Sequence, residues 1–171
     1  LAKEGRLERD IWLLHLTGEE FPSDCLGARH FCRALIEGTL RLHLGRGSWA
    51  DLSSTRVAGV VLMDMIAHNR DDEQDVFQIS PGKGGVSYRI ARHAHLANEV
   101  WNAGSREWNR RPERSGKGRG RRSVDGNTMP GIALHPHVRG EVRTADDPSS
   151  SLYNTDGQIF SDYGVPVVLF M

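Results

Sequence analysis

The chain has only two cysteines, Cys25 and Cys32, among its 171 residues. If the segment after Ser23 is helical, they lie roughly 10 Å apart along the helix axis, and a disulfide requires Cα atoms within ~7 Å. No second pair of Cys or His stands at zinc-finger spacing. We therefore interpret both as small, buried or half-buried apolar residues on one helix face, and the redox compartment stays open.

Net charge and long apolar runs are also absent. The 22 basic and 22 acidic residues cancel at pH 7, so no general attraction to nucleic acid or to an anionic membrane is expected. No apolar run approaches the ~20 residues that cross a bilayer, and no signal peptide is visible. Because the chain opens on Leu1 and stops at Met171 after an apolar run, we interpret it as a piece of a longer protein.

Apolar periodicity predicts strands that alternate with helices. The expected strands are Ile11–Leu16, Val57–Met63, Asp75–Ser80 and Val167–Met171. The expected helices follow a Ser23-Asp24 N-cap as far as Gly38, span Val86–Asn102, and form a short turn near Asp156–Tyr163. The segment Thr39–Leu44 is ambiguous. Such alternation implies right-handed crossovers, so the predicted fold class is α/β, a three-layer sandwich with a mostly parallel mixed sheet flanked by helices.

One stretch departs from this pattern. Residues Arg106–Arg122 hold seven arginines and Lys117 against Glu107 and Glu113, interleaved with Gly, Ser and Pro. A basic patch of this kind binds RNA or an acidic partner in some proteins, but its composition is more typical of a solvated surface insert. We expect a basic Gly/Arg-rich insert near residues 105–150 in one domain that spans residues 1–171.

Carboxylates follow two of the expected strands. Glu19 and Glu20 come after Ile11–Leu16, and Asp64 comes directly after Val57–Met63. Adjacent carboxylates at the end of a buried strand are costly unless cations or protons compensate them. Ligands gather at the carboxyl ends of parallel strands, and hard carboxylate ligands there indicate a metal-dependent hydrolase.

Three ordered motifs resemble those of the co-catalytic zinc aminopeptidases. The first is Leu16-Thr17-Gly18-Glu19-Glu20-Phe21 with Leu26-Gly27-Ala28-Arg29-His30-Phe31, the second is Val60–Ile66, and the third is Tyr153–Phe160 with Gly164–Phe170. That family includes bacterial leucyl aminopeptidases and, more distantly, glutamate carboxypeptidase and glutaminyl cyclase. The resemblance covers nearly the whole chain apart from the expected insert.

The resemblance implies a role for each acidic residue. Glu19 matches the general base, Glu20 a zinc ligand and Asp64 a ligand of the other metal. Asp156 matches an aspartate beside the site, with N-capping of the short helix as the alternative. Gly157 stands where many family members have histidine, which puts any role of that imidazole in doubt. We expect the four acids to converge at one edge of the sheet.

The remaining ligands of a two-zinc site are not visible in this chain. Of the five ligands that the family uses, only Glu20 and Asp64 are present, and we attribute this to truncation. The eight histidines are interpreted as core or surface residues: His15, His30, His43, His68, His93, His95, His135 and His137. The 171-residue piece alone is therefore expected to be inactive as a peptidase.

The leading hypothesis is part of a zinc-dependent exopeptidase, most simply an aminopeptidase that uses two Zn²⁺ ions and a peptide substrate. A carboxypeptidase or glutaminyl-cyclase relative is the alternative enzyme, and a metal-free receptor-like domain of the same fold is the alternative outside enzymes. No nucleic-acid partner and no membrane segment are expected, and the oligomeric state stays open. The family resemblance points to a secreted or periplasmic protein, while the residues themselves identify no compartment.

Overall fold

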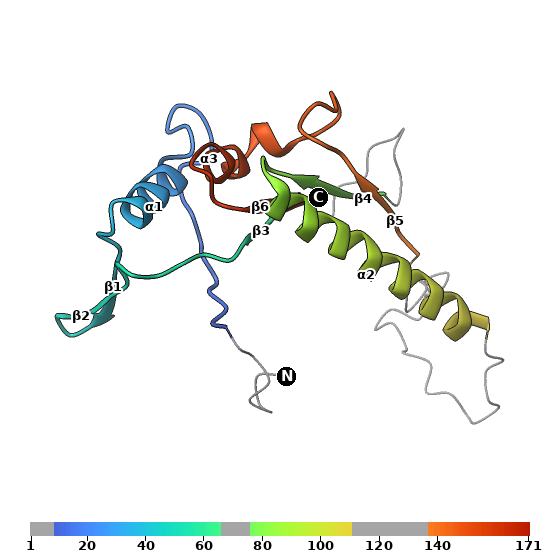
Figure 1. The fold of residues 1–171 in the computed structure, drawn as a ribbon, viewed down its shortest axis with the longest axis horizontal. Coiled ribbons are helices and arrows are strands. Elements are labelled where there is room, and N and C mark those ends of the chain that lie inside the picture. The colour runs from blue at the N-terminus through green and yellow to red at the C-terminus, as the bar shows by residue number, and fades with distance from the viewer. Residues whose placement is uncertain (1–8, 66–75, 111–136) are drawn as a thin grey trace, which may run out of the picture. The chain divides into compact units, whose positions relative to one another are not determined.

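The chain forms two compact units, Leu1–Thr55 and Arg56–Met171. The computed structural model describes residues 9–65, 76–110 and 137–171 (Figure 1). The helices and strands of each unit are given below for that unit by itself.

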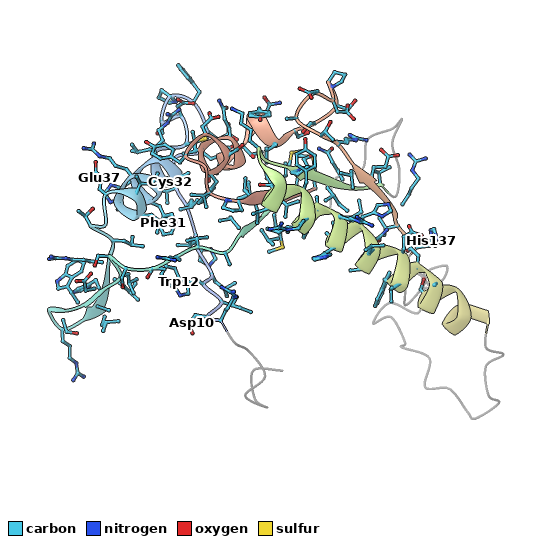
Figure 2. All side chains as sticks on the ribbon, viewed as in Figure 1. Asp10, Trp12, Phe31, Cys32, Glu37 and His137 are labelled. Atoms are coloured by element: carbon cyan, nitrogen blue, oxygen red, sulfur yellow. The ribbon has the colours of Figure 1, made fainter. Side chains whose placement is uncertain are left out.

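In its described residues, 9–55, the first unit holds one helix and one hairpin. Helix α1 spans Leu26–Ile36 and buries Ala28, Phe31 and Cys32 along one side. Figure 2 labels Phe31 and Cys32 on this helix. Both cysteines are buried and carry thiols, with exposed fractions of 8% for Cys25 and 0% for Cys32. Their predicted role as small apolar residues is confirmed.

The predicted Ser23-Asp24 N-cap is wrong, because the N-cap position is Cys25. Cys25 has a left-handed backbone, with φ of 59°, and its side chain makes no capping hydrogen bond. The carboxylate of Asp24 instead pairs with Nη2 of Arg29 at 2.6 Å, on the exposed surface. The backbone N–H groups at the start of the helix instead donate hydrogen bonds to carbonyl groups earlier in the chain, as described below.

The ambiguous segment after α1 becomes the first strand of a hairpin. Strand β1 (Arg41–Gly45) pairs antiparallel with β2 (Ser48–Asp51). Arg46 and Gly47 connect them with positive φ angles of 49° and 79°, the left-handed conformation that two-residue hairpin turns require. Across the strands, the rings of His43 and Trp49 lie 4.6 Å apart between centroids.

The predicted strand Ile11–Leu16 is wrong. The segment has no regular secondary structure, and Ile11 and Leu13 are 72% and 84% exposed. A strand needs a neighbour to satisfy its backbone groups, and β1 and β2, the strands described in this unit, pair with each other. An apolar run alone is thus not enough to form a strand. His15, which we expected inside a buried strand, is exposed.

The second unit, as far as its residues are described, is built on a mixed sheet of four strands. In chain order its elements are β3 (Val60–Met63), β4 (Val76–Pro81), α2 (Gly85–Arg110), β5 (Arg139–Val142), the 3₁₀ helix η2 (Leu152–Asn154), α3 (Asp156–Asp162) and β6 (Val167–Phe170). The spatial order of the strands is β3-β6-β4-β5. The outer pairs are parallel and the central β4–β6 pair is antiparallel. The predicted α/β class with a mixed sheet is confirmed.

Helix α2 covers one face of this sheet (Figure 1). Ala91 of the helix packs against Ile79 and Val168, all three with no exposed surface. The rings of Phe77 and Phe170 extend this core, with centroids 5.1 Å apart. Because side chains alternate along a strand, Val167 and Leu169 point to the opposite face, where α3 packs against β6. Both valine and leucine are fully buried.

Helix α2 also holds the outer strand β5 in place. The side-chain amides of Asn98 and Asn102 both donate hydrogen bonds to the carbonyl oxygen of Val138, over 3.0 and 2.7 Å. The side-chain oxygen Oδ1 of Asn102 accepts a hydrogen bond from the backbone N–H of Val138 at 3.2 Å. Gly140 permits this close contact, because a Cβ there would lie 2.7 Å from Nδ2 of Asn98.

Two parts of the stretch expected to be an insert belong to regular elements. Residues 105–110 complete α2, and Arg139–Val142 form β5. Most of the basic run, residues 111–122, lies outside the described residues, as do His68 and His135. Among the helices that the structure describes, none is long and apolar enough to cross a membrane.

Candidate functional site

The segment that carries Glu19 and Glu20 folds against the start of α1. Its carbonyl oxygens accept hydrogen bonds from backbone N–H groups at the start of the helix. Gly27 donates to Thr17 (3.0 Å), Leu26 to Gly18 (3.0 Å) and Cys25 to Glu19 (3.2 Å). The first amides of a helix have no partner inside the helix. Here the preceding backbone satisfies them, which fixes the main chain at the two glutamates.

Gly27 makes this close approach possible. A Cβ at this position would lie 2.7 Å from the carbonyl oxygen of Thr17, a distance that requires the backbone to move. Gly18 has a φ of 69°, which glycine adopts without strain. Gly18 and Gly27, which both belong to the first sequence motif, therefore allow the Glu19 segment to fold onto α1.

The two glutamates differ in exposure. Glu19 is half-buried and Glu20 is exposed. The carbonyl oxygen of Glu20 accepts the backbone amides of Ser23 and Asp24, at 2.9 and 3.2 Å, in a tight turn. The separate roles that the resemblance implies for the two carboxylates stay a prediction.

Asp64 lies at the carboxyl end of β3, as the sequence predicts. Its backbone N–H donates a hydrogen bond to the carbonyl oxygen of Phe170 in the neighbouring parallel strand, over 3.1 Å. The residue is half-buried. Met65 follows with a φ of 46°, outside the extended range of a strand. This geometry fixes the backbone of Asp64 at the sheet edge.

Asp156 is the first residue of α3 and is 7% exposed. It is not the N-cap: the hydroxyl of Thr155 accepts the backbone N–H of Gly157 over 3.1 Å and caps the helix. The N-capping alternative for Asp156 is therefore wrong. A first-turn acid is still favourable, because the start of a helix carries a partial positive charge.

The structure gives a reason for glycine at position 157, where many zinc aminopeptidases have histidine. A Cβ there would lie 2.6 Å from Cδ1 of Leu152 and 3.1 Å from Oγ1 of Thr155. Both neighbours are buried. An imidazole at this position would displace the capping hydroxyl and the leucine beneath it.

The end of α3 is tied to the loop after β4. Oγ of Ser161 accepts the backbone N–H of Lys83 at 2.9 Å, and Nζ of Lys83 pairs with Asp162 at 2.9 Å. The hydrogen bond to Asp162 raises the pKa of Lys83 above its usual value. Gly82 donates its amide to Val167, so this contact lies at the amino end of β6, away from the strand end that carries Asp64.

The four acids belong to different units. Glu19 and Glu20 are in the first, and Asp64 and Asp156 are in the second, so their convergence at one sheet edge stays a prediction. In the described parts of the chain, no group of three or more His, Cys, Asp or Glu is arranged to hold a metal ion. His137, labelled in Figure 2, is exposed, as are His30, His43 and His93.

The structure shows one polar cluster that the sequence does not reveal. Arg143 is 5% exposed, and its Nη1 donates to Oε1 of Gln78 at 2.9 Å and to the carbonyl oxygen of Ser149 at 3.2 Å. Its Nη2 pairs with Glu141 at 3.0 Å. Nε2 of Gln78 in turn donates to Ser80 at 2.8 Å. A lone arginine in a polar stretch carries no sequence signal of such burial.

Comparison of the chain with protein-family models, with curated proteins and with solved structures gave no match. The resemblance to zinc aminopeptidases therefore depends on the three sequence motifs.

Proposed function

We propose that this chain is part of a zinc-dependent exopeptidase, most simply an aminopeptidase with the three-layer fold of that family. The observation that carries the proposal is the position of Asp64, half-buried and fixed at the carboxyl end of β3 beside a parallel strand. This is where α/β enzymes place ligand-binding side chains. The roles proposed for Glu19 and Glu20 are taken from the three sequence motifs and their order along the chain.

The described carboxylates are of the right chemical kind for zinc but too few for a closed pair of ions. Glu20 and Asp64 would each hold one metal through a carboxylate oxygen, and the other ligands would come from the rest of the protein. When bound, the metals supply Lewis-acid chemistry and lower the pKa of water. Glu19 would accept a proton from the attacking water at a carboxylate oxygen and pass it to the leaving amine.

An assay on the full-length protein tests the enzyme class. We expect hydrolysis of amino-acid anilides that stops with a chelator and returns with added zinc. Cyclisation of N-terminal glutaminyl peptides, or release of C-terminal residues, would instead identify the two alternative enzymes on this scaffold. Stoichiometric zinc without any of these reactions would contradict a catalytic role, and an absence of bound metal would favour the receptor-like alternative.

A further inference from the structure

Among the strands that the structure describes, none pairs with the outer edge of β5. β5 is last in the order β3-β6-β4-β5. The amide of Arg143, just after the strand, donates to Ile79 of β4. Since backbone groups alternate in direction along a strand, the N–H and C=O groups of Gly140 and Val142 point outward. Open edges of this kind are templates for another strand.

A groove of about 440 Å³ runs between this edge and helix α2. Its lining consists of Tyr88, Arg92, His95 and Leu96 from the helix and Val142 from the strand. Val142 pairs with Ile79 and so lies on the sheet face that α2 covers. The volume falls within the roughly 300–1,000 Å³ of ligand sites, and a helix beside a strand edge is a geometry that receives an extended peptide.

The lining combines exposed apolar surface with positive charge. Leu96 is 51% exposed, and Tyr88 and Val142 are each 40% exposed. Arg92 is exposed in the groove, and Arg89 is exposed on the same stretch of α2. Glu99 is the acid on this part of the helix. The groove therefore suits a partner with apolar side chains and acidic groups.

We propose that this groove binds an extended acidic peptide that adds as a strand to β5. Main-chain hydrogen bonds would form with Gly140 and Val142, alternate apolar side chains would cover Tyr88 and Leu96, and a carboxylate would pair with Arg92. None of these residues has a role in the proposed peptidase site, so the two proposals stand or fall separately.

The chain's own residues 111–136 are a poor occupant on charge grounds. They carry six basic residues, Arg111, Arg114, Lys117, Arg119, Arg121 and Arg122, against the acids Glu113 and Asp125. A basic segment would be repelled by Arg92. A separate acidic peptide is complementary to Arg92. The chain's own acidic stretch Asp71–Asp75 has the same sign of charge, and the amide-exchange measurement below distinguishes an occupant from within the chain from a separate peptide.

Fluorescence anisotropy with a labelled peptide of alternating valine and aspartate tests this proposal. We expect binding at low salt at least about tenfold tighter than that of a peptide of alternating valine and lysine. Arg92→Glu should weaken binding of the acidic peptide about three- to tenfold. Arg41→Glu, an equal charge change at an exposed position on the β1–β2 hairpin, should leave it unchanged. Equal loss in both variants, or equal binding of both peptides, would overturn the proposal.

Two further measurements test the edge itself. Val142→Pro removes an outward N–H and should weaken peptide binding about tenfold while the circular dichroism spectrum is kept. Amide exchange at Gly140 and Val142 should slow when the peptide binds. Slow exchange at these amides without peptide, in dilute protein, would show that the chain covers its own edge. Protection that grows with protein concentration would identify a second copy as the occupant, and either result would overturn the proposal.

Discussion

The backbone amide of Asp64 donates a hydrogen bond to the carbonyl oxygen of Phe170 over 3.1 Å, at the carboxyl end of the parallel pair β3 and β6. The bond joins two residues far apart in the chain, both within the sequence motifs that resemble those of zinc aminopeptidases. It holds the main chain of a half-buried carboxylate at a sheet edge. A fixed backbone of this kind would suit the metal-ligand role that we propose for Asp64.

Substitutions at the adjacent glutamates should separate their roles in the full-length protein. Glu19→Gln keeps the size of the side chain and removes its basicity, so turnover should fall by about 10²–10⁴-fold while zinc content is kept. Glu20→Ala should instead lower zinc occupancy. Metal analysis beside steady-state kinetics distinguishes them, and loss of zinc in Glu19→Gln with retention in Glu20→Ala would reverse the assignment.

The glycine at position 140 should be essential to the contact between α2 and β5. Gly140→Ala would place a Cβ 2.7 Å from Nδ2 of Asn98, which is 9% exposed and hydrogen-bonded to Val138. We expect a loss of about 1–3 kcal/mol in the free energy of unfolding, measured by urea denaturation. Gly104→Ala is the matched control on α2, where a Cβ meets nothing within 4 Å. The control should be neutral or stabilising by up to about 1 kcal/mol, and equal effects would contradict the argument from close contact.

Arg143 should contribute more to stability than Arg139, the arginine four residues before it. Arg143→Met leaves Gln78 and Glu141 without this donor, and we expect a cost of about 2–4 kcal/mol in the free energy of unfolding. Arg139→Met removes an ion pair with Glu141 whose arginine side chain is 67% exposed, and should cost no more than about 1 kcal/mol. Thermal or urea denaturation of the two variants compares them directly. Similar costs would show that the burial of Arg143 has little energetic weight.

Lys83 should titrate above its usual range as long as Asp162 is present. Because its pKa is raised in the folded protein, the contribution to stability is complete below the pKa of the unfolded chain and is lost as pH rises through the folded value. Asp162→Asn should return the pKa of Lys83 toward 10.5, as followed by NMR titration of the lysine side chain. Ser161→Ala, which keeps the carboxylate, should change it less, and a pKa unchanged in Asp162→Asn would contradict the assigned cause.

Elements whose pattern is local were predictable from the sequence. Helix α2 was expected over Val86–Asn102, and the strands β4 and β6 were expected at Asp75–Ser80 and Val167–Met171, because apolar spacing and flanking Gly and Pro specify them. The strand after Pro166 begins where predicted. Asp64 follows β3 as expected, although the strand starts at Val60 rather than Val57.

Elements that depend on distant partners were not predictable. Ile11–Leu16 is as apolar as a buried strand but has no described strand to pair with in its unit, so residues 11–15 are exposed and Leu16 is half-buried. Arg139–Val142 shows the reverse: its sequence is mostly polar, and it becomes a strand because β4 pairs with it and Asn98 and Asn102 bind the backbone before it. The burial of Arg143 depends on Gln78, 65 positions earlier in the chain.

The central claim is that Glu20 and Asp64 belong to one two-metal site. A crystal structure of the full-length protein with zinc, with the ions located by anomalous scattering, tests it most directly. We predict two ions about 3.5–4 Å apart, with one carboxylate oxygen of Glu20 and one of Asp64 each at about 2.1 Å from a metal. Carboxyl oxygens of these two residues more than about 12 Å apart would contradict the claim, because ligands of one such pair cannot lie so far from each other.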